Sequence, residues 1–116
     1  MKNLILSTLL TVTATIYHAT PSQTYNTPDR TATNFKINMN NPEIHRIIAV
    51  SRDLEAKGFK MNTVVVISNA GDMNGLWVIR DRMNKRWTNR IDFLVDETMK
   101  GGKWTNVKIK LYEHSN

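Results

Sequence analysis

Apolar and polar residues alternate in short runs along much of this chain. In Thr11–Ala19, the apolar residues Val12, Ala14 and Ile16 alternate with threonines and a tyrosine. A period of two in a segment rich in β-branched residues is typical of a half-buried β-strand. Short apolar or alternating runs predict five more strands, at Ile47–Val50, Thr63–Ile67, Leu76–Arg80, Arg90–Val95 and Val107–Tyr112. Six short strands predict an all-β protein, and closure into a small barrel would leave no exposed sheet edge.

The segments between these runs contain turn-forming residues and little helical pattern. Thr20–Asn41 is rich in Thr, Asn, Ser and Pro, which predicts a long irregular loop. Ser51–Lys57 predicts a brief helix with Ser51 as its N-cap. Two shorter connections are predicted, a turn at Asn69–Gly75 and a single helical turn at Asp96–Gly102.

The amino terminus allows two interpretations. Lys2 followed by the apolar run Leu4–Leu10 resembles the start of a secretory signal, with cleavage after Ala14. The run is too short for a membrane span, which needs about 20 residues. Cleavage after Ala14 would cut the strand predicted at Thr11–Ala19 in half, so we favour the strand. The chain then consists of a signal-like extension at residues 1–10 and one barrel domain at residues 11–116.

Composition narrows the classes of function. The 116 residues are enough for one domain. Cysteine is absent, which excludes a disulfide framework, a thiolate metal site and a cysteine nucleophile. His18, His45 and His114 lack the spacing of metal ligands, so we expect no metal site. The chain also has no glycine-rich phosphate-binding loop, and we expect no cofactor. A formal net charge of +6 favours polyanions or an anionic envelope as partners.

The densest polar segment, Arg80–Asp92, holds five of the 16 basic residues and two aspartates. Asp81 lies at the end of one predicted strand, and Asp92 lies near the start of the next. A connecting loop would bring these strand ends together, so both carboxyls would face one pocket. Neighbouring carboxylates repel each other, and one of them then keeps its proton near neutral pH. Glycosidic cleavage requires such a protonated carboxyl. The arginines would bind substrate carboxylate or acetamido oxygens, and Trp87 would stack on a sugar ring.

The same segment also allows less specific interpretations. Its Asp and Arg residues are typical of surface ion pairs in a solvated loop, and Trp87 is typical of a core residue. A loop this basic also suits phosphate contacts in a nucleic-acid binder. We rank nucleic-acid binding last, because Asp81 and Asp92 would repel a phosphate backbone.

The segments Asp81–Asp92 and Ala49–Leu54 resemble the three-aspartate (3D) domain family. The likeness extends over nearly the whole chain, with Val12–Thr24 similar to the family's opening strand and loop and Gly101–Tyr112 similar to its closing segment. The resemblance implies a six-stranded double-psi β-barrel, similar to the catalytic barrel of membrane-bound lytic transglycosylase A and to the stationary-phase survival proteins.

The resemblance also implies an activity. The substrate would be peptidoglycan, whose MurNAc–GlcNAc β-1,4 bond would be cleaved without water to leave a 1,6-anhydro end. Asp92 matches the family's catalytic acid, and Asp81 matches the second aspartate, which would hold and tune it. The residues expected to bind the glycan are Tyr17, Thr20, Asp53, Asn89 and Arg90.

Two departures from the family pattern affect these assignments. Ser51 stands where the family carries its first aspartate, and the nearest carboxylate is Asp53. The loop after Asp81 reads Arg-Met-Asn-Lys-Arg where many relatives carry Thr-Gly-Gly, so a bulkier and more basic loop would narrow the groove or change its ligand.

The alternative to an enzyme is a non-catalytic module with the same barrel. Such a module would bind peptidoglycan without cutting it or form part of a phage virion. In either case the expected place of action is the bacterial cell envelope. A barrel strand that starts near residue 11 leaves too few residues for an ordinary signal peptide, so we expect delivery by a phage particle, release by lysis, or another export route.

Overall fold

The protein forms a closed all-β barrel in the computed structural model, which describes residues 9–19 and 29–113. Most of the amino-terminal run at Leu4–Leu10 lies outside the described residues, as does the first part of the loop predicted at Thr20–Asn41, including Thr20 itself. The described strands are β1 Leu10–Tyr17, β2 Ile47–Val50, β3 Val64–Ser68, β4 Gly75–Arg82, β5 Arg90–Leu94 and β6 Lys103–Leu111. The prediction of six strands in a closed all-β barrel is confirmed.

The strands follow the order β1-β5-β2-β4-β3-β6 around the barrel. Strand β1 pairs parallel with β5, and β2 pairs parallel with β4. The β1–β6 and β3–β4 pairs are antiparallel, as are β2–β5 and β3–β6. The pairing repeats in the two halves of the chain: β1 pairs parallel with β5 and antiparallel with β6, and β4 pairs parallel with β2 and antiparallel with β3. This is the pseudo-twofold organisation expected of a double-psi barrel. The two parallel pairs require long crossover connections.

Alternation of side chains along the strands fills the barrel. Phe93, Trp77 and Ile79 point inward with Val12 and Ala14, and each is at most 2% exposed. The Phe93 ring contacts two tryptophans, with centroids 4.7 Å from Trp77 and 5.5 Å from Trp104. The core therefore has an aromatic centre directly beneath β5.

A second apolar cluster lies outside the barrel wall over β2. It consists of buried Tyr17, Ala19, Ile37, Ile47, Ala49, Met83 and Leu94, with Phe35, Val78 and Trp87 packed against it. The segment after residue 29 supplies Phe35 and Ile37, and its backbone closes on itself through an isolated bridge between Arg30 and Lys36. This outer cluster covers the outward face of β2, whose four residues are all buried.

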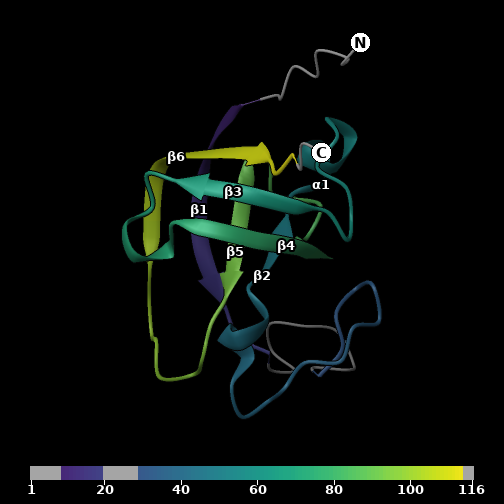
Figure 1. The fold of residues 1–116 in the computed structure, drawn as a ribbon, viewed down its shortest axis with the longest axis vertical. Helices are drawn as coiled ribbons and strands as arrows, with labels where there is room; N and C mark the ends of the chain where they lie inside the picture. Colours follow the sequence, from purple (N-terminus) through teal and green to yellow (C-terminus); the bar gives the residue numbers. More distant parts are fainter. Residues whose placement is uncertain (1–8, 20–28, 114–116) are drawn as a thin grey trace.

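Connections on opposite sides of the barrel separate the helix α1 from the long loops (Figure 1). The described part of the β1–β2 connection and the β5–β6 connection extend from one end, drawn at the bottom, and the helix α1 at Arg52–Ala56 lies at the other. Short 3-10 helices at Pro42–His45 (η1) and Gly71–Met73 (η2) were not predicted from the sequence. Gly75 has a φ of +123°, and a Cβ there would lie 3.0 Å from the Arg46 guanidinium, so this turn requires glycine.

Three local predictions need correction. Asp96–Gly102 is not a helical turn, because its backbone makes one bond from Met99 N–H to the Asp96 carbonyl (3.0 Å), which closes a simple β-turn. Ser51 precedes α1 as predicted, but its side chain does not cap the helix. The last strand begins at Lys103 rather than Val107, because residues from Lys103 onward already pair with β1.

Candidate active site

Asp81 and Asp92 lie in one row of residues that crosses four strands. Asp92 of β5 is paired with Thr15 of β1 on one side and with Ala49 of β2 on the other. Ala49 is in turn paired with Asp81 of β4. Directly paired residues point to the same side of a sheet, so all four side chains face outward, away from the barrel core. Two strand spacings separate the aspartates, which is about 10 Å between Cα atoms.

A β-bulge directs Asp81 to this face. Ile48 pairs with Ile79, but the next residue, Ala49, pairs with Asp81, so Arg80 is an extra residue in β4. Ile79 points into the core, and strict alternation would send Asp81 inward with it. The extra residue shifts Asp81 to the outer face beside Ala49. Bulges often re-aim side chains next to active sites.

Both carboxylate oxygens of Asp81 are engaged. The Tyr17 hydroxyl donates to Oδ2 at 2.7 Å, and the Ala32 backbone N–H donates to Oδ1 at 2.6 Å. Burial raises the pKa of Asp81, although these two hydrogen bonds and the charge of Arg82 oppose the rise. Burial raises the pKa of Tyr17 well above its ordinary value, and the negative charges of Asp81 and Asp92 add to this, so the phenol stays protonated as a donor.

Asp92 is held differently. The Thr15 hydroxyl donates a hydrogen bond to Asp92 Oδ1, and this is its one hydrogen bond within the part of the chain that the structure describes. Burial raises the pKa of Asp92, while the hydrogen bond from Thr15 and the positive charge of Arg90 oppose the rise. The sequence led us to expect that repulsion between two aspartates would keep a proton. Desolvation of each carboxyl is instead the leading cause, because two strand spacings separate them.

Asp53 and Asn89 contact each other at the α1 end of the barrel. The Asn89 backbone N–H donates to both Asp53 oxygens, at 2.9 and 3.2 Å, and its side-chain amide donates to the Thr11 carbonyl at 3.0 Å. Asn89 has a left-handed φ of 51°. Both side chains therefore fix the end of the loop between β4 and β5.

The β4–β5 loop packs against the outer apolar cluster through Trp87. The Trp87 indole lies against the outer apolar cluster, and the Arg90 and Arg86 guanidiniums lie over it at 4.3 and 4.8 Å from its centroid. Arg82 makes a two-pronged ion pair with Glu55 of α1, at 2.7 and 2.9 Å, on the protein surface. The loop residue Met83 is buried in the outer cluster.

The structure thus brings Tyr17 and Arg90 to the two aspartates and directs Asp53 and Asn89 to loop contacts. Thr15, the hydrogen-bond donor to Asp92, was not predicted as a site residue. The alternation in Thr11–Ala19 carried the signal, since it puts Thr13, Thr15 and Tyr17 on the same outward face. Ala32, which binds Asp81 through its backbone, left no such signal because any residue has an N–H except proline.

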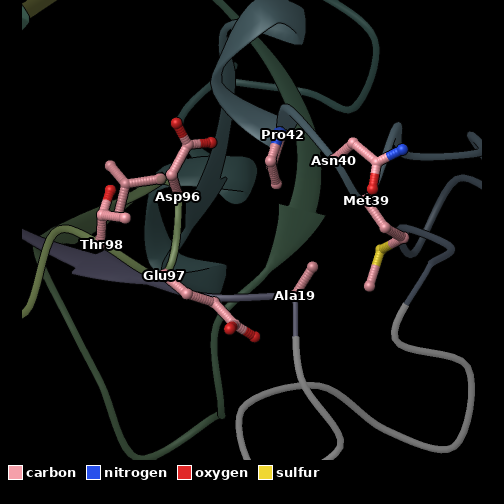
Figure 2. A pocket seen from close by; sticks show the side chains of 8 residues that line it. Ala19, Met39, Asn40, Pro42, Asp96, Glu97 and Thr98 are labelled. Carbon is pink, nitrogen blue, oxygen red and sulfur yellow. The ribbon is translucent and has the colours of Figure 1, made fainter.

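A pocket of about 340 Å³ opens at the end of the barrel beyond β5. Figure 2 shows Asp96, Glu97 and Thr98 on one side of it and Met39 and Asn40 on the other. The remaining lining residues are Ala19, Pro42 and Val95. Asp81 and Asp92 do not line this pocket, which shares Ala19 with the outer cluster.

No group of three or more His, Asp or Glu side chains among the described residues is arranged to hold a metal ion. No helix in the described part of the chain is long and apolar enough to cross a membrane. Comparison with known protein families, with curated proteins and with solved structures gives no match for this chain.

The raised pKa of Asp92 predicts a pH-dependent stability difference between the wild type and Asp92→Asn. The folded protein holds this proton more tightly than the unfolded chain, whose Asp pKa is about 3.9. The stabilisation is therefore fully present below about pH 4 and is lost as pH rises through the folded-state pKa. The asparagine of the variant has no such proton, so the free energy of unfolding of the variant should rise relative to the wild type between pH 4 and 7. Urea unfolding of both proteins measures this.

Asp53→Asn is the control of opposite sign. Burial raises the pKa of Asp53, but hydrogen bonds from the Ser51 hydroxyl and the Asn89 N–H outweigh it, and the pKa is lowered. The stabilisation of the folded state by the Asp53 carboxylate is present above about pH 4 and is lost as pH falls through the folded-state pKa. The free energy of unfolding of Asp53→Asn should therefore fall relative to that of the wild type as pH rises towards 4. If the free energy of unfolding of Asp92→Asn stays constant or falls relative to that of the wild type as pH rises, the assignment of Asp92 is contradicted.

Proposed function

We propose that this protein cleaves the glycan strands of peptidoglycan by the lytic transglycosylase reaction, with Asp92 as general acid and then general base. The observation that carries the proposal is the environment of the Asp92 carboxyl. Its carboxyl is half-buried, burial raises its pKa, and within the described residues its Oδ2 makes no hydrogen bond. A carboxyl whose pKa is raised towards neutral pH is suited to donating a proton to a leaving oxygen.

One carboxyl is enough for this reaction. Protonated Asp92 donates its proton to the oxygen that bridges MurNAc and GlcNAc as the bond from that oxygen to C1 of MurNAc breaks. The C6 hydroxyl oxygen of the same MurNAc ring then bonds to C1, and its proton passes to the Asp92 carboxylate. The acid is restored, and the product carries a 1,6-anhydro ring.

The contacts of Asp81 favour this reaction over hydrolysis. Glycoside hydrolases use a second carboxylate as base or nucleophile. Both oxygens of Asp81 already accept hydrogen bonds, from Tyr17 and Ala32, so Asp81 is poorly placed for either role. In the proposed reaction Asp81 is a positioning residue that holds Tyr17 and the loop around Ala32 beside the row of Asp92.

The experiment is incubation of the wild-type protein with purified sacculi and, in parallel, with glycan strands from which an amidase has removed the stem peptides, followed by mass spectrometry of the soluble products. We expect muropeptides that end in 1,6-anhydro-MurNAc. Products with reducing ends would indicate hydrolysis instead, and an absence of cleavage products from both substrates would contradict the enzymatic proposal.

A non-catalytic peptidoglycan-binding or virion module is the second candidate. The pocket described beyond β5 does not include Asp92, and the Ala32 segment already contacts Asp81. A barrel used only for binding would sediment with sacculi and release nothing. Both candidates act at the bacterial cell envelope.

A further inference from the structure

Arg90 presents a fixed cation beside Asp92. Its guanidinium lies 4.3 Å from the centre of the Trp87 ring, and stacking of this kind restricts a side chain that is otherwise flexible. Trp87 is itself held against the outer apolar cluster. The orientation of the Arg90 side chain is therefore set before any ligand arrives.

The backbone of Arg90 is also held on both sides. Its N–H donates to the Ser51 hydroxyl at 3.0 Å, and the Ser51 N–H donates to its carbonyl at 2.9 Å. Ser51 is 0% exposed. The residue that departs from the three-aspartate pattern thus anchors the start of β5.

The charge of Arg90 is available to a ligand. Arg90 forms no ion pair in the part of the chain that the structure describes, whereas Arg82, the last residue of β4, is paired with Glu55. Arg90 and Asp92 are two residues apart on β5, so they share a face and their Cα atoms are about 7 Å apart. If the reacting bond of a bound glycan lies at Asp92, a group on that glycan about one sugar ring away from the bond would reach Arg90.

We infer that Arg90 binds the free lactyl carboxylate of the MurNAc ring that bears the bond at Asp92. This inference rests on the proposed function. A guanidinium binds a carboxylate through two parallel hydrogen bonds, and these charge-assisted bonds are about twice as strong as neutral ones. In intact peptidoglycan the lactyl group is an amide that carries the stem peptide. The preferred substrate is therefore denuded glycan, which an amidase reaction must supply by hydrolysing that amide bond.

Binding of the carboxylate also assists the acid. The positive charge of Arg90 lowers the pKa of Asp92, which works against the protonated form. A bound carboxylate neutralises that charge, so the occupied site favours protonated Asp92 more than the empty site does. The contact between Arg90 and the carboxylate therefore selects the ligand and also favours the protonated form of Asp92.

The test is a binding measurement on Asp92→Asn protein, which does not consume its ligand in the proposed reaction. The probes are amidase-treated glycan strands, the same strands with their lactyl carboxyls reduced to alcohols, and chitin oligosaccharides, which lack the lactyl group. We expect the amidase-treated strands to bind at least about tenfold more tightly than the other two, since two charge-assisted hydrogen bonds are lost with the carboxylate. Strands that still carry stem peptides should bind like the reduced ones.

Arg90→Gln and Arg52→Gln, each in the Asp92→Asn background, form the matched pair. Arg52 is exposed on α1, so both changes remove one positive charge and only one removes it beside Asp92. Arg90→Gln should abolish the preference for the free carboxylate and Arg52→Gln should keep it. Arg90→Lys should restore part of it, and thermal unfolding of each variant verifies the fold.

The outcomes separate this inference from the proposed function. Equal binding of free and reduced strands, equal effects of the two glutamine variants, or no binding to any glycan would overturn the inference. If the wild type releases anhydro products without such a preference, the enzymatic proposal stands and the inference fails. If the preference is found but the wild type releases nothing, the inference stands and the protein is a binding module.

Discussion

Asp92→Asn is expected to lower the release of soluble muropeptides from sacculi by a factor of about 10² to 10⁴, the range that general acid–base catalysis contributes. The asparagine keeps a side-chain oxygen that accepts the hydrogen bond from Thr15, so the barrel should fold as before. What the variant lacks is the proton donated to the leaving oxygen. The measurement is the initial rate of product release at several pH values.

Asp72→Asn is the matched control for this variant. Asp72 is exposed in η2, so the change is chemically the same and lies outside the site. It should leave the rate within about twofold of the wild type, because surface substitutions rarely alter stability by more than about 0.5 kcal/mol. Activity of Asp92→Asn equal to that of Asp72→Asn would refute the role of Asp92.

Phe93→Ala is expected to lower the free energy of unfolding by about 3–5 kcal/mol, the usual cost of removing a buried aromatic ring. Phe93 is fully buried and contacts both Trp77 and Trp104, so the deletion leaves a cavity at the centre of the barrel. Domains of this size have a total stability of about 5–15 kcal/mol, so the variant should be close to unfolding. Urea unfolding followed by tryptophan fluorescence measures the change.

Ile44→Ala is the comparison for Phe93→Ala. The Ile44 side chain is 63% exposed on η1, so its removal should change the free energy of unfolding by no more than about 0.5 kcal/mol. If Phe93→Ala cost as little as Ile44→Ala, the inward orientation of Phe93 would be wrong. The outward orientation of Asp92 would fall with it, because neighbours on a strand face opposite sides.

The local pattern of the sequence predicted most of the strands well. β1, β3 and β5 lie within a few residues of their predicted ranges, because alternating or continuous apolar residues report directly on which side chains can be buried. The segment after β5 shows the limit of local signals. Asp96–Gly102 has residues that suit a helical turn, but it forms one β-turn, closed by the bond from the Met99 N–H to the Asp96 carbonyl.

The neighbourhood of the aspartates was predicted less completely. Consecutive strands suggested that Asp81 and Asp92 would lie side by side, but β2 lies between β4 and β5 and places Ala49 between the two carboxyls. This order follows from a parallel crossover, which joins segments distant in the chain. No local pattern specifies which strand is inserted.

The amino-acid sequence by itself determined that the chain is an all-β barrel and that its densest chemistry lies between residues 80 and 92, because hydrophobic period and charge are properties of neighbouring residues. Only the tertiary structure decided which way Asp81 points, what shares a row with Asp92, and why each carboxyl resists ionisation. The bulge at Arg80, the insertion of β2 and the burial of the two carboxyls all arise from contacts between segments far apart in the chain.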